Sequence, residues 1–214
     1  MKDQEGVIKY QLQYTESLPV KTELIREVNA WRRIFFLLGL IGQEPGRYGG
    51  YGFGNVSCRL KLGTNAFLIS GTQTAHLPEL FAEHYVLVSA CDPVKNRIVA
   101  EGPVKPSSEA LTHGAIYDAD TSVNFVFHVH SPDIWREAEH MGLPLTAPGV
   151  SYGTPEMAKE IKRLFKIVDT RASKTIVMGG HEDGVVTFGE TADVAGQTLI
   201  ACFSKALQLK DQNS

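Results

Sequence analysis

The stretch VNFVFHVH, residues 123–130, has the β-branched and aromatic composition of a β-strand. Because side chains on a strand alternate between its two faces, His128 and His130 project side by side from one face. The apolar residues Phe125, Phe127 and Val129 point the other way, towards a core. Two adjacent imidazoles suit a divalent metal ion, since neutral imidazole is the commonest metal ligand. The same pair could equally make hydrogen bonds at the end of a strand.

The composition limits what kind of protein this is. With 214 residues, 43% of them hydrophobic, the chain is long enough for one sizeable core. A net charge of −3 and a sequence pI of about 6.2 give no sign of a nucleic acid or an anionic membrane as a partner. The three cysteines form no CxxC pair, which indicates neither a disulfide framework nor a thiolate zinc site. The polar N-terminus and the short apolar runs favour a soluble, cytoplasmic protein.

Helical and strand-like segments alternate along the chain. We expect residues 1–20 to form a loose N-terminal arm that can include a short strand at residues 7–12, and residues 21–214 to form one domain. Helical periodicity or capping signals occur near residues 22–39, 107–119, 131, 154–168 and 191–207. Strand-like runs occupy residues 56–62, 66–70, 85–89, 97–100, 175–178 and 185–188. This order predicts an α/β sandwich, with a central mixed or antiparallel sheet and helices on both faces.

Three loops rich in small polar residues could share one role. They contain Asn55, then Ser70 and Gly71, then Ser107 and Ser108 at a helix start. Each loop offers hydroxyls, an amide or backbone N–H groups, and the first N–H groups of a helix attract anions. Together the loops could hold a phosphate without any lysine or arginine. Taken singly, each has the composition of an ordinary turn or helix cap.

These motifs stand in an order that resembles the class II aldolase/adducin family, which includes zinc-dependent sugar-phosphate aldolases. The resemblance runs from about residue 26 to residue 207, and it implies a class II aldolase-like three-layer αβα sandwich. It rests on the following motifs, in chain order: Gly54-Asn55-Val56-Ser57, Ser70-Gly71, Pro106-Ser107-Ser108-Glu109, His128-Val129-His130, Tyr152-Gly153-Thr154-Pro155 and a later loop with Gly180-His181.

The resemblance implies a role for each matching residue. His128, His130 and His181 correspond to three ligands of one Zn2+ per chain. Glu109 corresponds to the acidic residue that moves the proton. The residues that bind phosphate in the family correspond to five residues of this chain: Asn55, Ser70, Gly71, Ser107 and Ser108. Three protein ligands leave zinc an open position, where it acts on a substrate as a Lewis acid.

The sequence departs from the family pattern in two places. The family's aldolases carry a tyrosine acid, contributed across a subunit interface, in a segment that is shorter here and has no tyrosine at the matching place. Tyr152, Tyr48 and Tyr51 are therefore the candidate proton donors, and packing at a helix start is the alternative role for Tyr152. In addition, two acidic residues follow His181, where the family usually reads His-Gly.

From this resemblance we expect a zinc-dependent aldolase, a lyase that cleaves a small phosphorylated sugar by a retro-aldol reaction as a homotetramer. A sugar-phosphate epimerase or dehydratase would use the same metal site with a different acid. A non-catalytic adducin-like binding module would share the fold without the chemistry. Bound zinc separates the two kinds of enzyme from the module.

Overall fold

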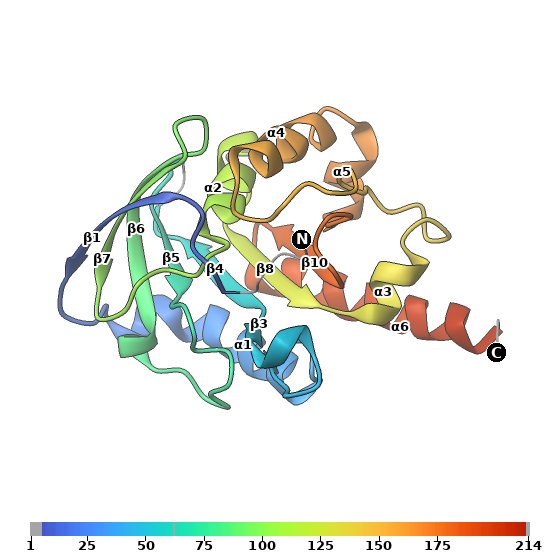
Figure 1. The fold of residues 1–214 in the computed structure, drawn as a ribbon, viewed down its shortest axis with the longest axis horizontal. Helices are drawn as coiled ribbons and strands as arrows, with labels where there is room; N and C mark the ends of the chain where they lie inside the picture. Colours follow the sequence, from blue (N-terminus) through green and yellow to red (C-terminus); the bar gives the residue numbers. More distant parts are fainter. Residues whose placement is uncertain (1–5, 62, 213–214) are drawn as a thin grey trace.

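Helices and strands alternate through residues 6–61 and 63–212, which a computed structural model describes (Figure 1). The strands are β1 (Gln11–Glu16), β2 (Gly42–Gln43), β3 (Gly52–Phe53), β4 (Asn55–Arg59), β5 (Phe67–Ser70), β6 (Tyr85–Asp92), β7 (Arg97–Gly102), β8 (Phe125–His130), β9 (Thr175–Val177) and β10 (Gly184–Gly189). The helices are α1 (Arg26–Leu37), α2 (Ala110–Ala119), α3 (Pro132–Glu137), α4 (Pro155–Leu164), α5 (Val168–Ser173) and α6 (Ala192–Gln212). Within these residues no helix combines the length and apolar character needed to cross a bilayer.

Eight strands form one sheet in the order β1-β7-β6-β5-β4-β8-β10-β9. Neighbouring strands pair antiparallel, except that β1 and β7 run parallel. The histidine strand β8 lies inside the sheet, where Asn55 of β4 pairs with His128 and Gly184 of β10 pairs with His130. Two partner strands therefore fix the register of the histidine pair. The expected mixed, largely antiparallel sheet is confirmed.

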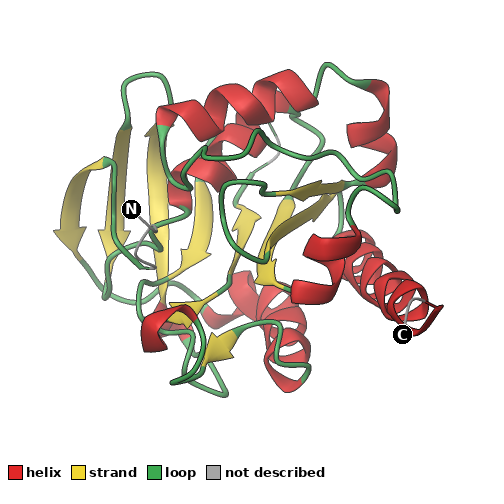
Figure 2. Cartoon of the chain, turned by 45° about the vertical axis from the view of Figure 1, so that its right-hand side comes forward, coloured by secondary structure: helices red, strands yellow, loops and turns green. Residues whose placement is uncertain are grey.

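Helices cover both faces of this sheet (Figures 1 and 2). Helices α2 and α4 bury their apolar residues in the core on one face, and α1, α3 and α6 bury theirs in the core on the other. The alternation along β8 matches the two cores, because Val126 belongs to the first and Phe127 and Val129 to the second. The chain is thus a three-layer αβα sandwich, as the sequence and the resemblance predict.

Part of the expected N-terminal arm is joined to the sheet. Residues 11–16 form β1, which pairs with the whole of β7 at the sheet edge. Tyr10 is buried, and Leu12 and Tyr14 pack against the same core. The alternation of these apolar side chains with polar ones gives this strand one core-facing side. Residues 1–5 of the predicted arm lie outside the described residues.

Candidate active site

Two histidine rings project from the end of β8 into the interior. The side chains of His128 and His130 are 1% and 0% exposed, and their ring centroids lie 5.0 Å apart. Both rings lie on the face of β8 that the strand alternation predicts for them, the face that also carries Val126 and is covered by α2 and α4. The pair is therefore buried beneath helices.

A third histidine joins them from the loop between β9 and β10. The Nε2 atoms of His130 and His181 are 3.2 Å apart, and the rings of His128 and His181 stack with centroids 5.3 Å apart. One nitrogen from each of the three side chains lies within 4.8 Å of the others. Tetrahedral zinc binds imidazole nitrogens at about 2.0–2.1 Å, which sets neighbouring nitrogens roughly 3.3 Å apart. The His130–His181 pair already has this spacing, and so the residues present fit a zinc ion.

The chemical state of the three rings also fits a metal. The Nδ1 atom of His128 lies 3.2 Å from the carbonyl oxygen of Val185, which only accepts hydrogen bonds. This contact places the ring proton on Nδ1, so that Nε2 carries no proton and can bind a metal ion. Burial lowers the pKa of His128 to about 4, and burial lowers the pKa values of His130 and His181 well below the ordinary value. Neutral imidazole is the form that binds metal.

Glu109 brings a carboxyl group to the same cluster. It is the N-cap residue of α2, but its side chain makes no capping hydrogen bond. Its Oε1 atom lies instead 3.3 Å from Nε2 of His181 and 3.8 Å from Nε2 of His128. The carboxyl group is 3% exposed. A carboxyl group therefore lies beside the three imidazoles.

His113, one turn further along α2, is part of a different buried network. Its Nδ1 atom lies 2.7 Å from the Ser57 hydroxyl, which in turn lies 2.7 Å from the Tyr117 hydroxyl. Burial lowers the pKa of His113 well below its ordinary value, so the ring is neutral. The network joins α2, the helix that begins after Glu109, to β4.

The small polar loops converge next to the histidines. Asn55, Gly71, Ser107 and Ser108 line one small pocket of about 30 Å³ together with Glu109 and His128. The side-chain oxygen of Asn55 is buried there and has no hydrogen-bond partner among the described residues. A buried amide without a partner is costly, and it is satisfied when a ligand or water supplies the bond.

Two of the predicted phosphate-binding residues have other contacts in this structure. The Ser70 hydroxyl accepts a hydrogen bond from the Val56 N–H at 3.2 Å. The Gly71 N–H donates to the carbonyl oxygen of His84 at 2.8 Å, so it is not directed at the pocket. The absence of a side chain at Gly71 allows Val104 to pack closely, since a methyl group at Gly71 would overlap the side chain of Val104.

Tyr152 lies against the third histidine, but its hydroxyl is directed elsewhere. Its ring centroid is 4.7 Å from that of His181, and its hydroxyl accepts a hydrogen bond from the Val7 N–H at 3.3 Å. The ammonium group of Lys9 lies 3.6 Å from the centroid of the Tyr152 ring. The N-terminal segment thus borders the site, a role that the sequence did not predict.

A second contact of this segment reaches the α2 end of the site. The Tyr10 hydroxyl donates to the carbonyl oxygen of Ser107 at 2.8 Å, and Gly6 lines the small pocket. The only sequence signal was the alternation of apolar and polar residues from Tyr10 onward, which indicates a strand but says nothing about its partner.

Tyr48 and Asp183 are further neighbours of the histidines that the sequence did not pair. The Tyr48 ring packs edge-on against His130, with centroids 4.5 Å apart, and its hydroxyl donates to Oδ2 of Asp183 at 2.6 Å. The third candidate tyrosine, Tyr51, is 43% exposed. The departure from the family's His-Gly pattern was the available signal, because it placed a carboxylate two residues after His181.

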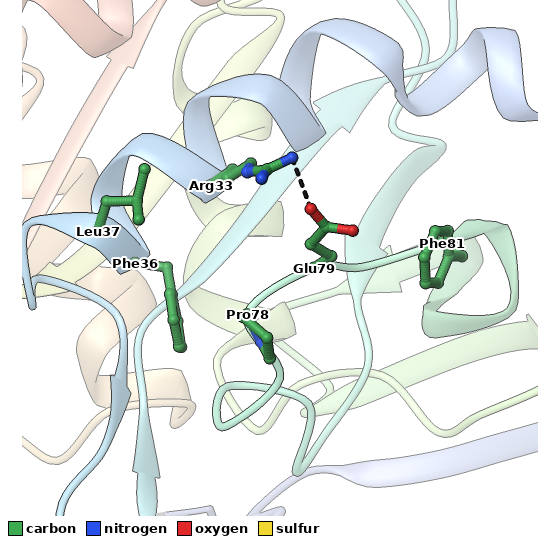
Figure 3. A pocket seen from close by; sticks show the side chains of 6 residues that line it. All are labelled: Arg33, Phe36, Leu37, Pro78, Glu79 and Phe81. Atoms are coloured by element: carbon green, nitrogen blue, oxygen red, sulfur yellow. Dashed lines mark ion pairs between the residues drawn. The ribbon is translucent and has the colours of Figure 1, made fainter.

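A larger pocket of about 390 Å³ lies on the outer side of α1 (Figure 3). Arg33 and Glu79 line this pocket and form an ion pair 2.6 Å long. The other lining residues are Phe36, Leu37, Pro78 and Phe81. Its lining residues are separate from those of the pocket beside the histidines. Among the described residues, this lining offers no group of metal ligands comparable to the histidine cluster.

A match between the sequence and a known protein family identifies the class of protein to which this fold and site belong. Residues 47–208 match the family described as Class II Aldolase and Adducin N-terminal domain. This match covers most of the chain, and the protein belongs to that family. A comparison with curated proteins gives no match.

Solved structures share the fold along nearly the whole chain. The L-fuculose-1-phosphate aldolase from Thermus thermophilus is 19% identical, with 90% of this chain and 95% of that chain covered and a TM-score of 0.65. A sugar-phosphate aldolase from Thermotoga maritima is 16% identical over 88% and 94% of the two chains, with a TM-score of 0.67. The N-terminal class II aldolase domain of a Thermoplasma acidophilum protein is 17% identical over 86% and 92%, with a TM-score of 0.58.

Proposed function

We propose that this protein is a zinc-dependent aldolase that cleaves a small phosphorylated sugar by a retro-aldol reaction. The observation that carries the proposal is the convergence of three buried, neutral imidazoles with the Glu109 carboxyl group, which lies 3.3 Å from His181. Membership of the class II aldolase family and the shared fold with sugar-phosphate aldolases support the substrate class.

His128, His130 and His181 would hold the metal, and Glu109 would move the proton. When bound, zinc supplies Lewis acidity to the oxygen atoms of a hydroxy-carbonyl substrate. Breaking the carbon–carbon bond leaves an electron pair on the carbon next to the carbonyl group, and that carbon must then gain a proton. Glu109 would carry this proton, a role supported by the 3.3 Å between its Oε1 atom and Nε2 of His181. The burial of the cluster excludes water, which strengthens each electrostatic contact.

The phosphate group would occupy the pocket beside Asn55 and the start of α2. The unpartnered oxygen of Asn55 leaves the pocket with unused hydrogen-bonding capacity, and an amide can present either its oxygen or its nitrogen. The N-terminus of α2 adds a favourable field for an anion. The pocket volume of about 30 Å³ is that of one or two waters. A sugar phosphate would therefore need the lining of this pocket, which includes Gly6, to open.

The hydroxyl group at the cleaved bond must also lose its proton as it becomes the aldehyde carbonyl. The tyrosine that exchanges this proton, accepting it in cleavage and donating it as an acid in the reverse aldol addition, remains a prediction. The Tyr152 ring lies 4.7 Å from the His181 ring, but its hydroxyl would have to leave the backbone of Val7 to act as an acid. A Tyr152→Phe variant that keeps zinc but loses turnover would support the acid role. Normal turnover by this variant would assign Tyr152 to packing.

The test is a screen of sugar phosphates for the release of triose products, with Glu109→Gln as the matched control. Glutamine keeps the size of the side chain but cannot take up a proton, so we expect turnover to fall about 10²- to 10⁴-fold while zinc is retained. Products of unchanged carbon number would instead identify the epimerase or dehydratase alternative. Absence of both zinc and turnover in the wild type would favour the non-catalytic module.

A further inference from the structure

The loop that carries His181 has an unusual backbone. Asp183, two residues after the histidine, has a φ angle of +62°, a left-handed conformation that residues other than glycine rarely adopt. The loop is closed by a hydrogen bond from the Gly184 N–H to the His181 carbonyl oxygen at 2.9 Å. The Asp183 carbonyl oxygen also accepts from the Ser131 N–H at 2.8 Å. The orientation of His181 therefore depends on a strained residue that needs support from its surroundings.

That support comes from Tyr48, 135 residues earlier in the chain, and from its neighbour Arg47. The Tyr48 hydroxyl donates to Oδ2 of Asp183 at 2.6 Å, and a guanidinium nitrogen of Arg47 donates to the same hydroxyl oxygen at 2.9 Å. Tyr48 also has a left-handed φ angle, +48°. Two strained residues are thus joined by one short, charge-assisted hydrogen bond.

The same tyrosine touches a second histidine of the cluster. Its ring packs edge-on against His130 at 4.5 Å, and Phe53 packs on the tyrosine ring at 5.1 Å. Burial raises the pKa of Tyr48, so its hydroxyl stays protonated and donates to Asp183. Tyr48 therefore contacts one histidine through its ring and the loop of another through its hydroxyl.

We propose that Tyr48 and Asp183 form a clasp that positions His130 and His181 to bind the metal. The proposal rests on the proposed function, in which these histidines are the ligands. It also gives a role to Asp183, which stands where the family pattern would place no acidic residue. Because its hydroxyl is already donated to Asp183, Tyr48 is a positioning residue and not the proton donor to the substrate.

The test is the zinc affinity of Tyr48→Phe, Asp183→Asn and the double variant, measured by competition with a chromophoric chelator. Phenylalanine keeps the ring contact and removes the hydroxyl. Asparagine tolerates the left-handed backbone but removes the charge of the carboxylate. We expect each variant to bind zinc about 10- to 100-fold more weakly, as is typical when a partner that orients a metal ligand is lost. The double variant should lose little more than either single one, because both changes break the same contact.

Tyr14→Phe is the matched control. The Tyr14 hydroxyl also donates a 2.6 Å hydrogen bond, to the Gly102 carbonyl oxygen at the far edge of the sheet. This variant should bind zinc with wild-type affinity. The visible spectrum of the Co2+-loaded protein should change for Tyr48→Phe and Asp183→Asn but not for Tyr14→Phe, a readout that a general loss of stability would not produce.

The outcomes separate the clasp from the proposed function. If the wild type binds zinc and both clasp variants bind it within about twofold of the wild type, the clasp is wrong and the metal site stands. If the wild type itself binds no zinc, the proposed function and the clasp both fail. Weaker zinc binding by the two clasp variants, with wild-type affinity in Tyr14→Phe, supports the clasp.

Discussion

Gly54 is the residue whose substitution most directly links backbone geometry to the three-histidine cluster. It precedes Asn55, has a φ angle of +79°, and lies where a methyl group would come within 2.6 Å of Ile41 Cγ1 and 3.1 Å of the His128 carbonyl oxygen. Ile41 is 1% exposed and cannot move into solvent. The Gly54→Ala variant must therefore strain its own backbone and push against a core residue and a histidine of the cluster.

The expected magnitude follows from these two effects. A left-handed alanine costs about 1 kcal/mol and overpacking of a core typically costs a further ~1–3 kcal/mol, so the free energy of unfolding should fall by roughly 2–4 kcal/mol. For a chain of this length that corresponds to a decrease in Tm of roughly 4–16 °C. Metal-free protein is used so that ligand binding does not add to stability.

The control is Gly149→Ala. Gly149 has a nearly identical φ angle, +83°, but a methyl group there meets nothing within 4 Å. It should lose only the backbone contribution of about 1 kcal/mol. Urea unfolding and calorimetry of both variants measure the difference. Equal losses of stability in Gly54→Ala and Gly149→Ala would refute the close packing that we describe around His128.

Four further predictions concern the site and the assembly. Because burial lowers the pKa of His128 to about 4, the unfolded chain binds a proton that the folded chain does not, and His128 alone should reduce the stability of metal-free protein by about 3 kcal/mol between pH 7 and pH 4 in urea titrations; the lowered pKa values of His113, His130 and His181 act in the same direction, and a flat profile would contradict this. Adding zinc at about a thousand times its Kd should raise stability by about 4 kcal/mol, and a chelator should reverse the gain. Ser70→Ala should cost about 1 kcal/mol by removing the acceptor of the Val56 N–H, and should weaken binding of phosphorylated sugars more than of unphosphorylated ones. Sedimentation should give a homotetramer, and a monomer would contradict the assembly expected from the resemblance.

The parts of the fold that the sequence predicted are those fixed by local periodicity. The alternation of residues 123–130 placed His128 and His130 on one face, because a strand has a period of two whatever surrounds it. Proline and hydroxyl residues at helix starts located α3 and α4, whose caps Ser131 and Thr154 accept hydrogen bonds as expected. Local chemistry was sufficient in each case.

The parts that could not be predicted depend on contacts between distant segments. Nothing in the sequence near Tyr48 indicates that its hydroxyl meets Asp183, since the contact requires left-handed backbone at both residues. The sequence indicated a short strand at residues 7–12, but neither its position at residues 11–16 nor its parallel pairing with β7. The meeting of His181 with the β8 pair came from the family resemblance alone, because loop position carries no periodic signal.

The central claim, that three histidines form one metal site, is tested most directly by zinc stoichiometry. The wild type and the single variants His128→Ala, His130→Ala and His181→Ala are dialysed against the same low zinc concentration, and metal per chain is measured by elemental mass spectrometry. The account predicts about one zinc per chain in the wild type and a sharp loss in every variant, because two remaining ligands bind zinc weakly. Full occupancy in any of the variants, or none in the wild type, would contradict it.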